Sequence, residues 1–301
     1  MKITFHGVRG SYPVPGKQTV GYGGNTTCVS FSKDSDGRVH RLIVDCGTGA
    51  ITLGREIVGN FFAKKEELSL TMLFSHLHPD HTQAFPFFAP NYFSECSIRL
   101  YGMKTLKKHV GSILEQSMLP PTFPIEYKDL KSDRKHFEVK DGDELEFPAK
   151  PARPVFRVKV MQAYAPSHPQ QGAIYYRITD IETGKSAACI WDIESKQGGD
   201  KAVINFSKDC DVMIHDTQYT DEEYESDRLV VQGFGHSTYT MAIENARQAK
   251  IREKLICTHF NPAHSDEKLD AIQADISARE KTGRDYAFET LLAKEGTEIE
   301  V

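Results

Sequence analysis

The sequence predicts a single α/β domain that is rich in β-strands. Short apolar runs recur along the 301 residues, and segments with helical periodicity lie between them. No stretch has the Gly, Ser or Pro bias of a linker, and no short repeat divides the chain. Strands interspersed with helices over a continuous chain favour one sheet-based domain that covers residues 1–301.

The expected strands are apolar segments bounded by glycines, prolines or polar turn residues. They are residues 2–8, 26–33, 41–47, 68–74, 155–164, 172–179, 186–191, 211–216 and 254–259. Phe156, Val158 and Val160 alternate with polar residues, so they should line one face of their strand. The sequence DIETGK separates two of the strands and predicts a hairpin turn around Gly184.

Three segments have the pattern of amphipathic helices, at residues 104–118, 237–250 and 266–282. The last begins after Ser265, a suitable N-cap, and has acidic residues in its first turn. Leu269, Ile272 and Ile276 lie on one face of this helix.

The composition limits the classes of protein to which the chain can belong. Acidic residues exceed basic ones by 42 − 37 = 5, so the surface should not attract nucleic acid non-specifically. No stretch approaches the roughly 20 apolar residues of a membrane helix, and the first residues lack the apolar run of a signal peptide. Six cysteines are scattered without a CxxC pair. They are typical of buried free thiols in a reducing cytoplasm, with disulfides as the less favoured alternative.

The segment TMLFSHLHPDH, residues 71–81, ends a strand in four side chains that can bind metal: His76, His78, Asp80 and His81. A lone histidine is usually a surface or core residue. Four such groups on one loop would repel each other when protonated, or lose hydration when buried, unless a cation compensates them. His76 and His78 can project together while Asp80 and His81 turn away, which suits two neighbouring cations.

Further candidate ligands follow other expected strands. His168 stands in AYAPSH, Asp192 in CIWD and His259 in ICTH. Each alone is an ordinary turn or loop residue. Because an α/β sheet gathers its functional residues beyond the carboxyl ends of its strands, the recurring pattern of a strand followed by a ligand indicates one shared site.

In this order of motifs the chain resembles the metallo-β-lactamase superfamily. The matching residues are Asp45 after an early strand, the HLHPDH loop, and then His168, Asp192 and His259, so that the resemblance spans essentially the whole chain. It implies a four-layer αββα sandwich built from two similar halves. It also implies a first metal site of His76, His78 and His168, and a second of Asp80, His81 and His259, with Asp192 bridging both.

This implied ligand set of nitrogen and carboxylate donors suits two Zn²⁺ ions, with Mn²⁺ or Fe²⁺ as alternatives. Such a metal pair lowers the pKa of a shared water from roughly 15.7 towards 7 and so makes hydroxide available at neutral pH. Two divalent ions also outweigh the charges of Asp80 and Asp192. The site should therefore favour an anionic substrate.

The segment GFGHSTYT places His236 just before an expected helix, with Ser237 or Thr238 as its N-cap. A capping-loop histidine is the simpler interpretation. The segment also resembles the HST motif of the phosphodiesterase branch of the superfamily, which includes tRNase Z and cyclic-phosphate phosphodiesterases. This resemblance implies that His236 stabilises or protonates the leaving oxygen of a phosphate ester, and that Asp80 orients His236 in addition to binding metal.

Other segments resemble the branch less closely. Glycine-rich turns carry Arg9, Ser11, Asn25 and Thr26, which line the pocket in one interpretation and only shape turns in the other, favoured one. The aromatic and proline-rich residues at 113–125 pack the core, or form a lid or dimer contact. His215 and Asp216 are interpreted as structural. His264 is not expected to bind metal and at most contacts a residue that does.

The leading functional hypothesis is hydrolysis of a small anionic phosphodiester, such as a cyclic nucleotide or another cyclic phosphate. A tRNase Z-like endoribonuclease is the first alternative, but the 44 residues from Asp192 to His236 contain DEEYESD and no basic arm for RNA. A lactamase or thioesterase would not need His236. A di-iron oxidoreductase is disfavoured by His78, where that branch has glutamate. Relatives in this branch are commonly dimers, so the resemblance leaves both a homodimer and a monomer open.

Overall fold

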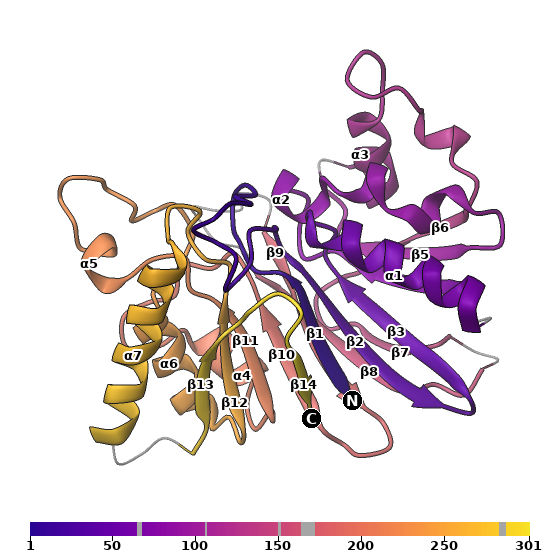
Figure 1. Cartoon of the computed structure of the whole chain (residues 1–301). Coiled ribbons are helices and arrows are strands. Elements are labelled where there is room, and N and C mark those ends of the chain that lie inside the picture. Colours follow the sequence, from indigo (N-terminus) through magenta and orange to yellow (C-terminus); the bar gives the residue numbers. More distant parts are fainter. Residues whose placement is uncertain (65–67, 106, 150–151, 164–171, 283–286) are drawn as a thin grey trace.

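The computed structural model describes residues 1–64, 68–105, 107–149, 152–163, 172–282 and 287–301. Two seven-stranded sheets lie face to face at its centre (Figure 1). The first sheet runs in the order β14 (Glu298–Glu300), β1 (Lys2–Gly7), β2 (Cys28–Ser35), β3 (Arg38–Val44), β4 (Ser69–Leu73), β5 (Ser97–Gly102), β6 (Asp133–Glu138). The second runs β13 (Glu289–Leu292), β12 (Lys254–Thr258), β11 (Val212–Asp216), β10 (Ser186–Ile190), β9 (Ala173–Asp180), β8 (Phe156–Ala163), β7 (Glu144–Phe147).

The two sheets have the same internal plan. In the first, β1 to β3 pair antiparallel and β3 to β6 pair parallel. In the second, β7 to β10 pair antiparallel and β10 to β13 pair parallel. The pairing confirms the expected two similar halves, with β14 returning to pair with β1 at the edge of the first sheet.

Strand side chains alternate between two hydrophobic layers. In β3, Leu42 and Val44 belong to the core between the sheets, whereas Ile43 belongs to the core on the outer face of the first sheet. The expected alternation in β8 is confirmed, because Phe156 and Val158 are buried between the sheets. A strand that buries both faces needs apolar residues at successive positions, as β3 and β4 have.

Helices cover the outer face of each sheet. Helices α1 (Gly49–Lys64) and α3 (Val110–Ser117) pack on the first sheet, together with the short helices α2 (Pro79–Thr82), η1 (Phe85–Phe87), η2 (Ala89–Tyr92) and η3 (Tyr127–Asp129). Helices α4 (Lys201–Phe206), α6 (Tyr239–Ala249) and α7 (Asp266–Thr282) pack on the second, and α5 (Asp221–Tyr224) lies beyond them (Figure 1). The predicted αββα sandwich is confirmed.

Two of the three expected helices have nearly the expected bounds. Thr238 caps α6 by accepting a hydrogen bond from the Met241 amide, and the Ser265 hydroxyl accepts one from the Lys268 amide in the first turn of α7. The helix expected at 104–118 is shorter, because Thr105 and Lys108 exchange backbone hydrogen bonds in a tight turn that precedes α3.

Helix α1 was not expected from the sequence, because glycines interrupt its apolar pattern. Gly54 is where the Phe88 ring packs on the helix, and a Cβ there would lie 2.8 Å from that ring. The six cysteines are all free and buried, as expected. No helix among the described residues is long and apolar enough to cross a membrane.

Candidate metal centre and active site

The candidate site lies where the parallel strands of both sheets end. Asp45 follows β3, the HLHPDH loop follows β4, Asp192 lies just beyond β10, Asp216 ends β11 and His259 follows β12. Asp45, Asp192 and His259 have left-handed backbone conformations, with φ of 61°, 48° and 62°. Such conformations cost of order 1 kcal/mol or more for residues other than glycine, and they persist where the surrounding structure holds a functional side chain in place.

Two groups of potential ligand atoms face each other at this point. In the first, the Nε2 atom of His76 lies 2.9 Å from Nδ1 of His78 and 3.3 Å from Oδ2 of Asp192. The three residues form a group able to hold a metal ion. His168, the remaining ligand implied for this site, lies outside the described residues.

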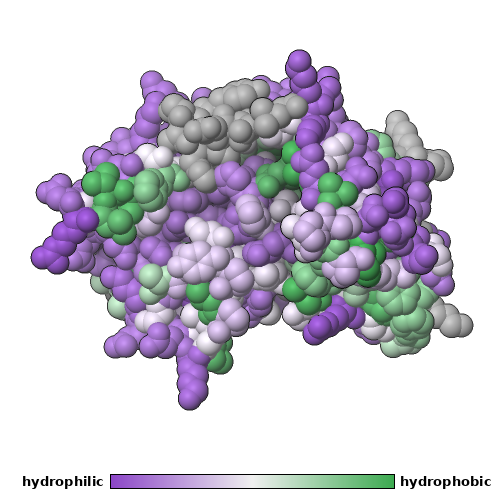
Figure 2. All heavy atoms as spheres, turned by 90° about the horizontal axis from the view of Figure 1, so that it is seen from above, coloured by the Kyte–Doolittle hydropathy of each residue, from purple (hydrophilic) through white to green (hydrophobic). Residues whose placement is uncertain are grey.

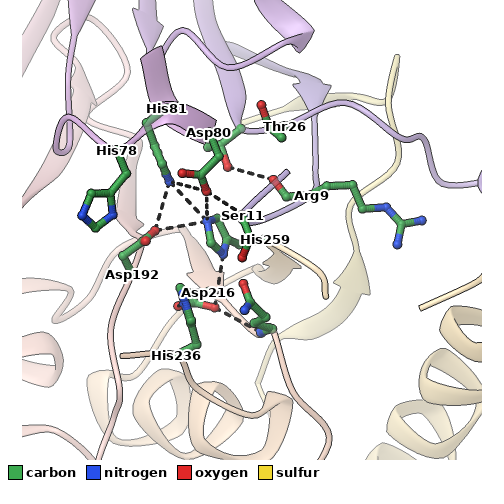
Figure 3. A network of polar contacts seen from close by, with 12 residues as sticks. Arg9, Ser11, Thr26, His78, Asp80, His81, Asp192, Asp216, His236 and His259 are labelled. Atoms are coloured by element: carbon green, nitrogen blue, oxygen red, sulfur yellow. Dashed lines mark hydrogen bonds and ion pairs between the residues drawn. The ribbon is translucent and has the colours of Figure 1, made fainter. Parts of the chain in front are cut away.

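The second group consists of Asp80, His81 and His259. Nε2 of His81 lies 3.2 Å from Nε2 of His259 and 3.4 Å from Oδ2 of Asp80, and the distance from His259 Nε2 to Asp80 Oδ2 is 3.3 Å. Oδ1 of Asp192 lies 3.2 Å from both imidazole nitrogens. One oxygen of Asp192 therefore faces each group, as Figure 3 shows for the second.

These separations fit a metal ion. Four ligands around a tetrahedral zinc, at bond lengths of about 2.0–2.1 Å, lie about 3.3 Å from one another. The distances of 3.2 to 3.4 Å within the second group match that value. Because Nδ1 of His81 is hydrogen-bonded to Asp45, its Nε2 presents a lone pair towards a carboxylate and another imidazole when the ring is neutral. A cation between them relieves this repulsion.

Residues behind the two groups fix their orientation. Oδ2 of Asp45 accepts hydrogen bonds from His81 Nδ1 at 2.8 Å and from the Ser75 hydroxyl at 2.6 Å, and that hydroxyl lies 3.1 Å from Nδ1 of His76. The Ser11 amide donates to Oδ2 of Asp80 at 2.7 Å. Such partners hold histidine and carboxylate ligands in one orientation and one tautomer.

The buried carboxylates give the site a strongly negative electrostatic potential. Burial by itself would lower the pKa of His81, but Asp80, Asp192 and Asp45 together raise it well above its usual range. Conversely, burial would raise the pKa of Asp80, but His81 and His259 lower it below its usual range. The carboxylates thus favour a positive charge among them, whether a proton or a metal ion supplies it.

His236 lies beside the second group and is oriented by Asp216. Nδ1 of His236 is 2.8 Å from Oδ2 of the buried Asp216, and the His236 ring stacks on the His259 ring with centroids 5.0 Å apart. Oδ1 of Asp216 lies 3.8 Å from His259 Nδ1 (Figure 3). Asp192, His236 and His259 form a third group able to hold metal.

The interpretation of Asp216 as only structural was therefore incomplete. Its signal in the sequence is a strand followed by an acid, VMIHD, the same pattern that indicates the metal ligands. The expectation that Asp80 orients His236 stays a prediction, whereas Asp216 makes a hydrogen bond to it. His215 is structural, as expected: it is buried, and its two ring nitrogens contact the Asp216 carbonyl and the Asn245 amide.

The glycine-rich turns mainly shape the site. The buried Arg9 donates to the carbonyl groups of Gly23, Asn261 and His264, and its guanidinium points away from the cluster (Figure 3). Asn25 and Thr26 also make structural contacts: Asn25 donates to Glu295, and Thr26 exchanges hydrogen bonds with Thr48.

His264 and the segment at 113–125 lie farther from the cluster. His264 pairs with Glu223. In the segment, Met118 is buried in the outer core, and Phe123 packs edge-on against Phe87. Core packing thus accounts for these two side chains, and the lid or dimer contact stays a prediction.

A cavity of about 480 Å³ opens beside His236. Its lining comes from three loops, those around residues 11–12, 229–236 and 261–262, and from the segment after β11. The lining residues are Ser11, Tyr12, Gln218, Tyr219, Leu229, Val231, Gly233, Phe234, His236, Asn261 and Pro262. Its volume falls within the roughly 300–1,000 Å³ that is usual for small-molecule sites.

The αββα sandwich and the paired groups of ligands at its strand ends define a metal-binding protein with the metallo-β-lactamase fold. A sequence model described as the beta-lactamase superfamily domain matches residues 40–260. The chain therefore belongs to this superfamily. It is a metal-dependent hydrolase.

Relatives in sequence and structure cover nearly the whole chain. Ribonuclease Z of Prochlorococcus marinus subsp. pastoris is 24% identical, with 88% of this chain and 89% of the relative covered, and ribonuclease Z of Haloarcula marismortui is 22% identical, with 92% and 93% covered. Among solved structures, the metallo-beta-lactamase fold protein YhfI from Bacillus subtilis has a TM-score of 0.65 at 20% identity, with 99% and 98% covered. Unliganded yeast PDE1 has a TM-score of 0.66 at 13% identity, with 99% and 98% covered, and the short form of human tRNase Z has 0.58 at 16%, with 100% and 99% covered. The structural likenesses show a shared fold.

Proposed function

We propose that the protein is a phosphodiesterase that uses two divalent metal ions to hydrolyse a small phosphodiester, a cyclic nucleotide or another cyclic phosphate. The observation that carries this proposal is the hydrogen-bonded pair of His236 and Asp216, which lies between the second group of ligand atoms and the 480 Å³ cavity. Hydrolysis of an alkyl phosphate ester needs an activated water, and a proton donor for the poorly leaving alkoxide oxygen accelerates it. The site contains candidates for both roles.

In this proposal His76, His78 and His168 hold the first ion, Asp80, His81 and His259 hold the second, and Asp192 bridges them. Zinc suits these donors, with manganese or iron as alternatives. When bound, two such ions would polarise the phosphate and activate a water molecule. The neighbouring groups keep the ligands in place: Asp45 holds His81, and the Ser11 amide holds Asp80.

His236 supplies the proton for the leaving group. Because Asp216 accepts the Nδ1–H of the ring, Nε2 is the nitrogen that exchanges a proton with the substrate. The imidazolium donates the Nε2 proton to the leaving oxygen as the P–O bond breaks, and the Asp216 carboxylate stabilises the cationic ring.

His236→Ala tests this assignment. The variant should keep the metal content of the wild type but lose 10²- to 10⁴-fold in kcat, the usual range for a lost general acid. The loss should shrink for a substrate with a nitrophenolate leaving group, which needs no proton to depart. His81→Ala should instead lose metal and activity together. Loss of a metal ion from His236→Ala would assign this histidine to the metal, as the third group of ligand atoms allows.

A tRNase Z-like endoribonuclease is the second candidate, because the two ribonuclease Z relatives match about nine-tenths of the chain. A long RNA needs an extended basic surface, whereas this chain has a net charge of −5, helix α5 carries Asp221, Glu222 and Glu223, and no lysine or arginine among the described residues lines the cavity. The charge balance favours the small substrate.

A hydrolysis screen of the metal-loaded protein separates the candidates. The panel contains 3′,5′- and 2′,3′-cyclic nucleotides, cyclic dinucleotides, precursor tRNA, a lactam and a thioester. Turnover of a cyclic phosphate with mild salt dependence supports the proposal. Cleavage of precursor tRNA at its 3′ trailer, with binding that weakens steeply as salt rises, would favour the endoribonuclease instead.

A further inference from the structure

We infer that the cavity beside His236 is a subsite for the leaving-group half of the substrate, and that it binds an uncharged planar ring, a nucleobase, between aromatic and aliphatic side chains. This inference rests on the proposed function, because it takes the role of His236 from it. Since His236 lines the cavity and protonates the leaving oxygen, the group that enters the cavity belongs to the departing alcohol.

The walls of the cavity have the composition of a site for a flat apolar group. Tyr12 comes from the N-terminal loop, and Leu229 and Phe234 come from the loop that leads to His236. Tyr12 is 56% exposed, Leu229 68% and Phe234 53%. Figure 2 shows apolar surface on both sides of a polar hollow. Exposed apolar residues gathered around a catalytic cavity mark a binding surface.

The Glu194 carboxylate fixes the loop at 225–235, which carries Leu229 and Phe234 on one wall of the cavity. Oε1 of Glu194 accepts a hydrogen bond from the Tyr224 hydroxyl at 2.8 Å and from the Gly233 amide at 2.8 Å, and its Oε2 accepts from the Gly235 amide at 3.1 Å. Glu194 thus ties both ends of the loop at 225–235 to the segment that carries Asp192. Leu229 and Phe234 are held open towards the cavity without packing into the core, which suits a preorganised wall.

The described lining of the cavity offers no partner for a second phosphate in this half of the substrate. These lining residues include no lysine or arginine, and their polar side chains other than His236 are uncharged. A second phosphate would lose hydration there without a compensating charge, whereas an uncharged ring needs none. The polar edge of a base can contact Tyr219 and Asn261, which also line the cavity.

Binding of a product-like ligand tests the subsite without requiring turnover. Calorimetry on metal-loaded protein compares adenosine 5′-monophosphate with ribose 5-phosphate, which lacks the base. The wild type should bind the nucleotide more tightly. Tyr12→Ala and Phe234→Ala should each weaken nucleotide binding by roughly 5- to 100-fold, the range of a lost base–aromatic stack, and leave ribose 5-phosphate unaffected.

Leu229 and Val230 provide a matched control. They are neighbours with similar exposure, 68% and 62%, but Leu229 lines the cavity and Val230 does not. Leu229→Ala should weaken nucleotide binding, whereas Val230→Ala should not. Equal affinity of the wild type for the two ligands, or an equal effect of the two alanine variants, would overturn the inference.

The screen described above keeps this result separate from the proposed function. If a phosphodiester is hydrolysed but the base contributes nothing to binding, only the subsite is wrong. If the base contributes but no phosphodiester on the panel is cut, the subsite stands as a ring-binding cavity and the proposed reaction is wrong.

Discussion

Gly10 is the position where one added methyl group should disturb the metal centre most directly. A Cβ built on Gly10 would lie 2.4 Å from both Cε1 and Nδ1 of His259 and 2.3 Å from Oε1 of Gln218. Ordinary contacts begin at 3.4 Å, so the His259 ring must move by 3.4 − 2.4 = 1.0 Å to admit it. The φ of Gly10 is not in the left-handed region, so alanine fits the backbone and only the contact is changed.

A shift of this size matters because metal–ligand distances tolerate only about 0.2 Å. We expect Gly10→Ala to bind the second metal ion 10- to 100-fold more weakly, the range found when the support of a ligand is lost, and to lose activity in proportion. The assay is metal content by elemental analysis along a chelator titration. Asp192 and the first group should still hold one ion.

Gly16→Ala is the matched control, because Gly16 lies on the same loop and a Cβ there meets nothing within 4 Å. It should bind both ions like the wild type. If Gly10→Ala also binds both ions with wild-type affinity, metal binding does not depend on this position of the His259 ring, and the assignment of His259 to the second group is wrong.

Three further predictions test other parts of the structure. Asp216→Asn should keep both metal ions but lose 10²- to 10⁴-fold in kcat, measured with a cyclic phosphate, because it replaces one carboxylate oxygen by an amide group and removes the negative charge that orients His236 and stabilises its cation. Chelation should abolish activity and lower the melting temperature measured by calorimetry, and zinc or manganese should restore both, because the buried carboxylates lose their counter-charge. Asp180→Asn should lower the free energy of unfolding at neutral pH by about 3 kcal/mol in denaturant titrations, because the fully buried Asp180 binds Lys33 at 2.7 Å and so ties β9 of one sheet to β2 of the other. Burial would raise the pKa of Asp180, but Lys33 and two backbone amides lower it, so this stability is present above the unfolded pKa near 3.9 and is lost as the pH falls below it. The exposed pair of Lys159 and Glu144 is the control, and Glu144→Gln should change stability little.

Most of the fold was predictable because its strands carry their own signals. The buried ends of β3 and β4 are apolar, LIV and ML, and the hairpin at Gly184 has the turn residue that its φ of 72° requires. Helix α1 was missed because tertiary contact decides it: Gly54 weakens the helical pattern, but Phe88 packs against the flat surface that this glycine leaves. The start of α3 was misplaced because the turn formed by Thr105 and Lys108 is a local hydrogen-bonding event that apolar periodicity does not reveal.

The candidate ligands were predictable for a different reason. An apolar strand followed closely by histidine or aspartate is a recognisable sequence pattern, and His76, Asp192 and His259 all fit it. The residues behind them are harder to assign. Asp45 also follows a strand, but the sequence does not show that it contacts His81, 36 positions away. Ser11 acts through its backbone amide, so its side chain gives no hint. Glu194 is similar, because its partners are a hydroxyl and two glycine amides.

The two halves of the molecule use equivalent positions for different tasks. Asp45 follows β3 and Asp192 lies just beyond β10, and each of these strands is where its sheet changes from antiparallel to parallel pairing. Both residues have positive φ, which turns the side chain back over the strand ends. Asp45 points at Ser75 and His81 and so lies behind the ligands, whereas Asp192 faces both groups of ligand atoms. A repeated fold thus places one carboxylate on each side of the same histidine, and His81 is held between Asp45 at Nδ1 and Asp192 at Nε2. By accepting the Nδ1–H of His81, Asp45 fixes the tautomer that leaves Nε2 of this ring able to bind the proposed metal ion.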